Sequence, residues 1–233
     1  MNDNWGIVGI GKLGEAILTQ FNHCNMPIGI YHPNIDKVTE TTKSYPRTRI
    51  LQKADLASLD FLILALPANN VIPFINDYHQ SKGLTLQHTT LINMATSMPT
   101  EKLRKAFPDL TWTGMKFVGH SESLKRYGNG LFITAEEVVE KEEYQEVYQC
   151  FSKLGQVVVD KESIVEKINK LSTYHAIKVA RELEQELGEQ GLSDLFKEQA
   201  LRSILPEVIR AYSKGNLGHF AQDVIKKLEQ EEK

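Results

Sequence analysis

A glycine-rich segment near the start of the chain, W-G-I-V-G-I-G-K-L-G over Trp5–Gly14, constrains the fold more than any other stretch. A short apolar run leads into Gly9, Gly11 and Gly14, and residues of helix-forming composition follow. In this strand–turn–helix context G-x-G-x-x-G indicates a dinucleotide-binding unit. Gly9 would permit a tight turn, Gly11 would let a pyrophosphate approach the backbone, and Gly14 would let helix and strand pack closely.

The helix behind the glycines would offer the phosphates its unpaired N–H groups and the positive end of its dipole. A second predicted strand follows about twenty residues after the motif, as in dinucleotide-binding folds, which favours binding over a merely structural glycine turn. We therefore predict that the cofactor-binding residues of this loop are Gly9, Gly11, Lys12, Leu13 and Gly14.

Strand and helix signals alternate through the first two thirds of the chain and then become purely helical. The predicted strands are 5–10, 28–32, 48–51, 60–66, 89–93, 112–117, 131–135 and 156–160, and the helices between them are 12–22, 34–44, 71–80, 97–107 and 141–154. Three further helices are predicted at 162–187, at 194–214 with a kink at Pro206, and at 217–229. The pattern predicts an α/β fold in which a Rossmann-type doubly wound sheet, residues 1–160, precedes an all-α domain, residues 161–233.

Composition narrows the class of protein. The net charge of -3 over 233 residues argues against a nucleic-acid partner, whose binding domain is normally basic. No apolar run reaches the ~18 residues that a membrane span needs, and no basic leader precedes the first strand. Cys24 and Cys150 stand in no motif, as expected of thiols in a reducing compartment, and the scattered histidines give no metal-ligand spacing. We expect a cytoplasmic protein without a metal site.

The end of the second strand bears on cofactor choice. NAD-selective sites usually place a carboxylate there to bond the ribose hydroxyls, whereas this chain has Y-H-P-N-I-D-K over 31–37, with Asp36 already in the next helical turn. His32, Asn34 and Lys37 can all donate hydrogen bonds to a 2′-phosphate. The segment favours NADP over NAD, and it is equally compatible with an ordinary polar loop in which Asn34 caps a helix.

Two loops follow strands that should be fully buried. In open parallel sheets ligands bind outside the carboxyl ends of the strands, so both loops should line the cofactor cleft, the second near the nicotinamide end. From the segments L-P-A-N-N and N-M-A-T-S we predict cofactor contacts by Leu66, Pro67, Asn69, Met94 and Ala95. Turn chemistry alone would also account for proline and asparagine at these positions.

The order G-I-V-G-I-G-K-L-G, Y-H-P-N-I-D-K and F-L-I-L-A-L-P-A-N-N-V-I-P-F-I resembles the N-terminal domain of pyrroline-5-carboxylate reductases. The resemblance is strongest over the first 75 residues and continues more weakly to the long helix near Leu171. It implies an NADP-preferring oxidoreductase in which a Rossmann domain is followed by a helical dimerisation domain. It also implies a homodimer formed through the C-terminal helices, and a small-molecule substrate.

The chain departs from this family at several positions. The family's V-K-P turn is replaced by Leu66-Pro67-Ala68, and its methionine–asparagine–proline element is replaced by Met115-Lys116-Phe117-Val118. The S-P-G-G-T-T segment, which in the family supplies contacts to the proline ring and a catalytic threonine, is not found in the sequence. The resemblance therefore supports the fold and the cofactor rather than the pyrroline substrate.

A reductase also needs a proton donor, and tyrosine or lysine can provide one. Lys170, Tyr174 and Lys178 share one face of the predicted long helix, which in related two-domain dehydrogenases faces the cleft. The alternative is a solvated lysine stripe with Tyr174 at a dimer interface. His120 lies in F-V-G-H-S, which resembles the loop of prephenate dehydrogenase-like enzymes that faces a carboxylate-bearing substrate, although a plain loop histidine is the alternative. We name Tyr174, Lys170 and His120 as catalytic candidates.

These observations lead us to expect hydride transfer between NADP(H) and a small imine or carbonyl substrate. Two alternatives remain open at this point. One is a dinucleotide-binding regulatory protein, or a degenerate paralogue, without catalysis. The other is a dehydrogenase of a small carboxylate substrate that uses His120.

Overall fold

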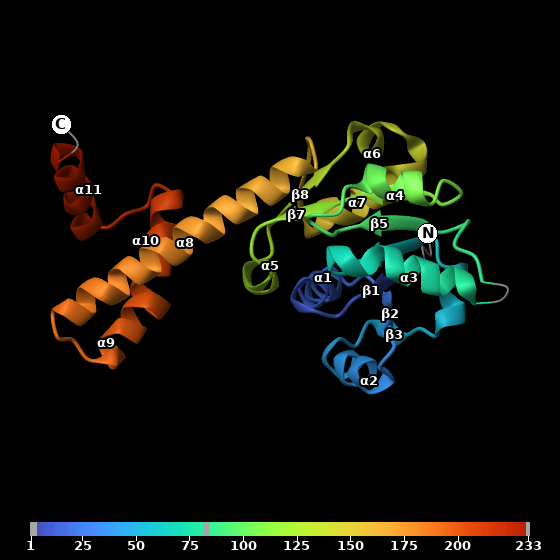
Figure 1. Ribbon diagram of the computed structural model, residues 1–233, viewed down its shortest axis with the longest axis horizontal. Coiled ribbons are helices and arrows are strands. Elements are labelled where there is room, and N and C mark those ends of the chain that lie inside the picture. The colour runs from blue at the N-terminus through green and yellow to red at the C-terminus, as the bar shows by residue number, and fades with distance from the viewer. Residues whose placement is uncertain (1–3, 82–83, 232–233) are drawn as a thin grey trace. The chain divides into compact units, whose positions relative to one another are not determined.

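The computed structural model describes residues 4–81 and 84–231, and its ribbon is drawn in Figure 1. The strands are β1 (Trp5–Val8), β2 (Ile28–Tyr31), β3 (Thr48–Ile50), β4 (Phe61–Leu64), β5 (Thr90–Asn93), β6 (Trp112–Gly114), β7 (Lys116–Val118), β8 (Gly130–Thr134) and β9 (Gly155–Val159). The helices of the same region are α1 (Lys12–His23), α2 (Ile35–Ser44), α3 (Ala68–Gln80), α4 (Thr100–Ala106), α5 (Ser121–Tyr127), α6 (Glu136–Glu140) and α7 (Gln145–Leu154), with short 3-10 turns at Lys53–Ser58 and Glu142–Tyr144. The helices that follow are α8 (Ser163–Glu189), α9 (Asp194–Gln199), α10 (Leu205–Ser213) and α11 (His219–Glu231).

Six strands form the main sheet in the order β3-β2-β1-β4-β5-β6, and every pairing in it is parallel. The chain runs outward from β1 to β3, returns to the middle, and runs outward again from β4 to β6. The strand order therefore reverses between β1 and β4, which is where a doubly wound sheet opens a crevice at the carboxyl ends of its strands. The predicted Rossmann-type sheet is confirmed.

The two faces of this sheet are covered by different helices, which gives two hydrophobic cores. Alternate residues of a strand point to opposite faces, so Ile7 and Ile63 enter one core, whereas Val8 and Leu64 enter the other. The first core contains side chains of α1, α2 and α7, and the second contains side chains of α3 and α4. Strands buried on both faces need continuous apolar runs, which is how the sequence of β4, F-L-I-L, reads.

A second, three-stranded sheet corrects part of the sequence prediction. The predicted strand over 112–117 is wrong, because the chain leaves the main sheet after Gly114 and enters another at Lys116. There β7 pairs antiparallel with β8, and β8 pairs parallel with β9. The apolar run carries no glycine or proline after Gly114 to mark this change of sheet.

Smaller elements also differ from the prediction. The sequence pattern does not predict helices α5 and α6, since each is a short segment with little periodicity. Helix α4 begins at Thr100, because Pro99 forms its N-cap. The helical stretch predicted over 194–214 is interrupted as expected: residues Ala200–Ile204 form a π-helical turn, and Pro206, which lacks an N–H donor, stands at the start of α10.

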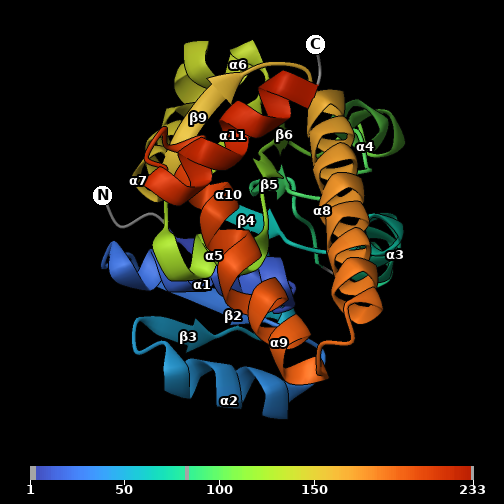
Figure 2. The same ribbon diagram turned by 90° about the vertical axis from the view of Figure 1, so that its left-hand side faces the viewer.

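Contacts divide the chain into two units, Met1–Lys170 and Leu171–Lys233. The first turns of α8 count with the α/β unit, since Val165 is buried and Asn169 Nδ2 donates to the carbonyl of Phe117 at 3.3 Å. Figure 2 shows the rest of α8 and the helices that come after it in the chain, α9, α10 and α11. Within residues 171–231 no side chain is buried. None of the helices in the described ranges is long and apolar enough to cross a membrane.

Candidate cofactor-binding site

The register of the main sheet brings the predicted cofactor loops to a single edge. Val8 pairs with Tyr31 on one side and with Leu64 on the other, and Leu64 pairs in turn with Asn93. The residues that follow these four positions must therefore emerge side by side at the carboxyl ends of the strands. The glycine loop, the His32 loop, the Leu66 loop and the Met94 loop all begin here.

The glycine loop has the conformation that the motif requires. Gly9 has a φ of 98°, a region that L side chains rarely adopt, and a Cβ there would meet the carbonyl of Ala65. A Cβ on Gly14 would meet the carbonyl oxygen of Gly9. A Cβ on Gly11 would meet nothing within 4 Å. The first and third glycines thus allow the chain to pack against itself, whereas the second faces open space.

Helix α1 begins directly after that open space. Its N-cap is Gly11, which has no side chain to accept from the first-turn N–H groups, and its first two residues are Lys12 and Leu13. Such unpaired N–H groups and the positive end of the helix dipole form an anion site. Helix α3 begins at the same edge with Pro67 as its N-cap, also without a side-chain cap.

The loop after β2 combines helix capping with exposed donors. Asn34 Oδ1 accepts from the Lys37 N–H at 3.1 Å and caps α2, and the Asn34 N–H donates to His32 Nδ1 at 3.0 Å. Asn34 therefore does cap the helix. Because the cap uses its side-chain oxygen Oδ1, the side-chain NH₂ of Asn34 is the group available to a ligand. Asp36 lies in the first turn of α2, beyond the strand end.

The remaining loop residues differ in what they expose. Leu66 packs against the Gly9 turn, and Asn69 is exposed in the first turn of α3. Met94 is fully buried in the core beneath the sheet edge, and Ala95 is nearly so. At these two positions only the backbone can face a cofactor.

A buried polar cluster, which the sequence did not predict, fixes the loop after β5. Lys116, whose side chain has 0% exposure, donates through Nζ to the carbonyls of Ala95 at 2.7 Å and Met98 at 2.9 Å. Its Nζ lies 3.8 Å from Glu162 Oε2. Glu162 also accepts from the Thr100 N–H at 2.9 Å and from Thr100 Oγ1 at 2.5 Å.

Asn93 completes this cluster from the end of β5. Its Nδ2 donates to the Met98 carbonyl at 2.8 Å and to Thr100 Oγ1 at 3.0 Å, and its Oδ1 accepts from the Ala95 N–H at 3.1 Å. Burial lowers the pKa of Lys116 to about 8, partly opposed by the nearby Glu162 carboxylate. The only sequence signal for this cluster was a single lysine inside the apolar run M-K-F-V.

The three candidates for proton transfer all have exposed side chains. His120 is exposed and caps α5, its Nδ1 accepting from the Glu122 N–H at 3.3 Å. Lys170 is 76% exposed and pairs with Glu166 at 2.7 Å one helical turn away. Tyr174 is 62% exposed and its ring meets that of His175 edge-on at 5.3 Å. Their catalytic role stays a prediction.

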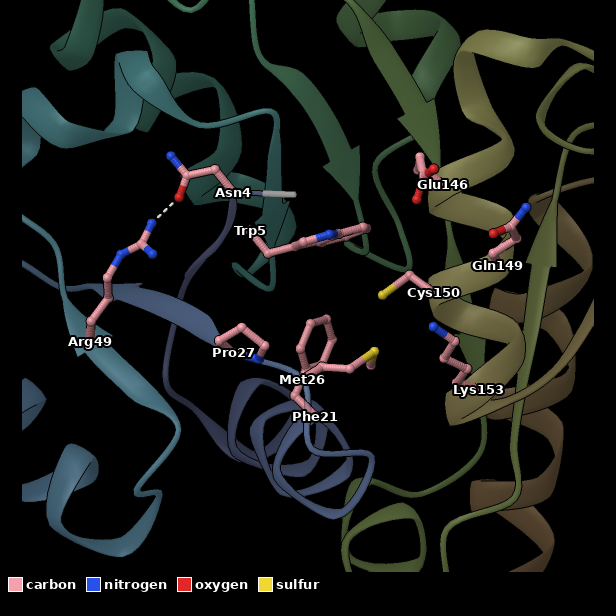
Figure 3. A pocket seen from close by; sticks show the side chains of 10 residues that line it. All are labelled: Asn4, Trp5, Phe21, Met26, Pro27, Arg49, Glu146, Gln149, Cys150 and Lys153. Carbon is pink, nitrogen blue, oxygen red and sulfur yellow. Dashed lines mark hydrogen bonds between the residues drawn. The ribbon is translucent and has the colours of Figure 1, made fainter. Parts of the chain in front are cut away.

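The recess drawn in Figure 3, about 580 Å³, lies at the opposite end of the strands. Trp5 is the first residue of β1, and Met26 and Pro27 directly precede β2. Phe21 belongs to the last turn of α1, whose negative dipole end disfavours phosphate. The topology of the sheet and the dipole of α1 both favour the other edge for a dinucleotide.

Across the described parts of the chain, no group of three or more His, Cys, Asp or Glu side chains is arranged to hold a metal ion. Neither Cys24 nor Cys150 forms a disulfide.

The chain is similar to known oxidoreductases in two respects. Residues 4–108 match a family model described as NADP oxidoreductase, coenzyme F420-dependent. Among curated proteins none matches the sequence. Several solved structures, at low sequence identity, share the fold along nearly the whole chain.

A pyrroline-5-carboxylate reductase from Coxiella burnetii gives a TM-score of 0.70 at 15% identity, over 98% of this chain and 85% of that one. The pyrroline carboxylate reductase of Plasmodium falciparum, solved with NADP bound, gives 0.65 at 16% identity, over 97% and 84%. A reductive aminase from Aspergillus terreus in complex with NADPH and ethyl-5-oxohexanoate gives 0.61 at 14% identity, over 92% and 79%. The N-terminal domain thus matches the NADP oxidoreductase family, and the chain has the fold of the pyrroline-5-carboxylate reductases and imine-reducing enzymes.

Proposed function

We propose that this protein is an NADP(H)-dependent oxidoreductase acting on a small imine or carbonyl compound. The observation that carries the proposal is the conformation of the glycine loop. Backbone atoms occupy the space that a side chain at Gly9 or Gly14 would need, whereas Gly11 borders open space beside the uncapped N–H groups of α1. This arrangement favours a pyrophosphate. The NADP(H) held by the structural neighbours supports the same choice of cofactor.

The residues around the loop suggest how the cofactor would be held. The N–H groups at the start of α1, those of Lys12 and Leu13 among them, would bind the pyrophosphate, and His32, Asn34 and Lys37 would donate to the 2′-phosphate. Leu66, Pro67 and Asn69, with the backbone of Met94 and Ala95, would border the nicotinamide half. When bound, the cofactor would supply a hydride to the carbon of a C=N or C=O bond.

A proton must reach the nitrogen or oxygen of that bond as the hydride reaches its carbon. Tyr174, Lys170 and His120 remain the candidates for this step. Substituting each separately, as Tyr174→Phe, Lys170→Met and His120→Gln, would identify the donor by loss of kcat with little change in cofactor affinity.

Turnover tests the proposal. Purified protein is mixed with NADPH and a panel of cyclic imines, ketones with amines, and 2-oxo acids, and the loss of absorbance at the reduced nicotinamide band is followed. Turnover of imines or carbonyls supports the proposal. NADPH binding without turnover of any of them would favour the regulatory alternative, and turnover confined to carboxylate substrates and abolished by His120→Gln would favour the third one.

We also infer a homodimer formed through the C-terminal helices. No side chain of residues 171–231 is buried, and large apolar side chains are exposed on each helix of this segment. Examples are Tyr174, Leu195, Tyr212 and Phe220. Apolar surface of this extent is typical of an interface, and a two-fold dimer is the simplest way to cover it.

A further inference from the structure

We propose that Lys116, paired with Glu162, is a positioning residue that holds the loop Met94–Pro99 in the conformation that receives the nicotinamide half of the cofactor. The inference rests on the proposed function for its ligand. It concerns a residue at which this chain departs from the pyrroline-5-carboxylate reductase pattern, Lys116 in the segment M-K-F-V.

The side chain of Lys116 bridges the two sheets. Lys116 is the first residue of β7 in the second sheet, yet its ammonium group reaches the loop that follows β5 of the main sheet. It bonds two carbonyls of that loop, those of Ala95 and Met98, at 2.7 and 2.9 Å. A single cation thus closes the loop on itself, because the two carbonyls stand at either end of its turn.

Without this cation the loop would lose its link to Glu162 and to helix α4. A lysine is seldom fully buried unless it is paired, and this one takes its charge compensation from Glu162. Glu162 also accepts from the N–H and hydroxyl of Thr100, at the first turn of α4. The pair therefore fixes both the turn of the loop and the start of the helix that follows it.

The position of the loop in the sheet relates it to one half of the cofactor. The loop leaves the carboxyl end of β5, in the second mononucleotide-binding half of the sheet, where the nicotinamide half of a dinucleotide lies. The first half, with β1 and β2, would bind the adenosine part. Displacement of this loop should accordingly weaken the binding of ligands that carry nicotinamide and leave the affinity for ligands without it unchanged.

The experiment compares Lys116→Met, which keeps an unbranched side chain one atom shorter and removes the charge, with Lys105→Met as its control. Lys105 is 76% exposed on α4 and pairs with Glu101 at the surface, at 3.4 Å. For each full-length variant, the affinity for NADPH and for 2′-phospho-ADP-ribose, which has no nicotinamide, is measured by calorimetry. Amide hydrogen exchange is measured in the ligand-free protein.

We expect Lys116→Met to weaken NADPH binding by about tenfold, as for the loss of one charge-assisted hydrogen bond, with 2′-phospho-ADP-ribose affinity unchanged. Exchange should accelerate in residues 94–100 and stay as in the wild type in β1 and β2. Lys105→Met should change neither the two ligand affinities nor the exchange rates. Glu162→Gln, which retains the bulk of the side chain, should show the same pattern more weakly and serves if Lys116→Met does not fold.

Equal weakening of both ligands, or unchanged exchange in residues 94–100, would overturn the positioning role. If wild-type protein bound neither ligand, the proposed function itself would fail, and the exchange measurement would still decide whether Lys116 holds the loop. The two failures are therefore distinguishable.

Discussion

Gly11 and Gly14 belong to one motif, yet an added side chain would meet different surroundings at the two positions. At Gly14 a Cβ would enter the space of the Gly9 carbonyl, whereas at Gly11 it would enter open space. The backbone of Gly11, with φ −83° and ψ −168°, is also extended and acceptable to any residue. One glycine therefore serves the fold, and the other leaves room for a ligand.

This contrast predicts different outcomes for two substitutions. Gly11→Val should abolish NADPH binding while lowering stability by no more than ~1 kcal/mol, the difference between a good and a poor N-cap residue. Gly14→Ala should lower the melting temperature sharply, because backbone atoms must move. Fluorescence titration and thermal unfolding would measure both effects. Unchanged NADPH affinity in Gly11→Val would mean that the ligand is not held at this loop.

Asn34 offers a test of the 2′-phosphate contacts at little risk to the fold. Asp accepts the Lys37 N–H as well as Asn does, so Asn34→Asp should keep α2 capped while placing a negative charge beside the phosphate. The preference for NADPH over NADH should shrink or reverse. Asn34→Ser, which caps without charge, is the control. An unchanged cofactor ratio in Asn34→Asp would remove Asn34 from the phosphate site.

At the scale of elements, the sequence predicted what depends on local patterns and missed what depends on distant partners. The glycine loop, the parallel strands of the main sheet and the interruption near Pro206 all have local signals. The second sheet has none at the point where the chain leaves β6, since Met115 lies inside a continuous apolar run. Lys116 could not be identified as part of the site because its partner, Glu162, is far away in the sequence.

The buried lysine of β7 also predicts how stability changes with pH. Its pKa is about 8 in the folded protein and 10.5 when unfolded, so between these values the unfolded chain binds the extra proton. The free energy of unfolding must then rise with pH between 8 and 10.5, by up to about 3 kcal/mol from this group alone. Below pH 8 the lysine is charged in both states, and the folded protein bears the full cost of burying that charge.

Lys116→Met removes that contribution and leaves the other titrating groups in place. The difference in unfolding free energy between wild type and Lys116→Met should therefore shift in favour of the wild type as pH rises from 8 to 10.5. Denaturant unfolding at several pH values measures it. A difference independent of pH would show that Lys116 keeps the ordinary pKa of lysine when folded.

At the scale of the whole molecule, the two units differ in how they are stabilised. The α/β unit has two internal cores, whereas the described residues of the helical unit bury no side chain. Small domains have little core of their own, so the helical unit should depend on a second copy of the chain.

Sedimentation equilibrium at micromolar concentration tests this dependence. We expect a species of twice 26.4 kDa, and replacement of Leu195 and Phe220 by Asp should shift it toward the monomer. Leu195 and Phe220 are 70% and 86% exposed, so the substitutions should leave the α/β unit folded. A wild-type protein that sediments as a single monomer would refute the dimer.

The central claim is that the edge of the sheet formed by β1, β2, β4 and β5 binds NADP(H), and calorimetric titration with NADPH and NADH tests it most directly. His32, Asn34 and Lys37 can donate to the 2′-phosphate, and no carboxylate stands at the end of β2 to repel it. One well-placed charge-assisted bond is worth ~1.5–3 kcal/mol, or roughly 10- to 150-fold in affinity. NADPH should therefore bind at least about tenfold more tightly than NADH. Equal affinities, or tighter binding of NADH, would contradict this account of the site.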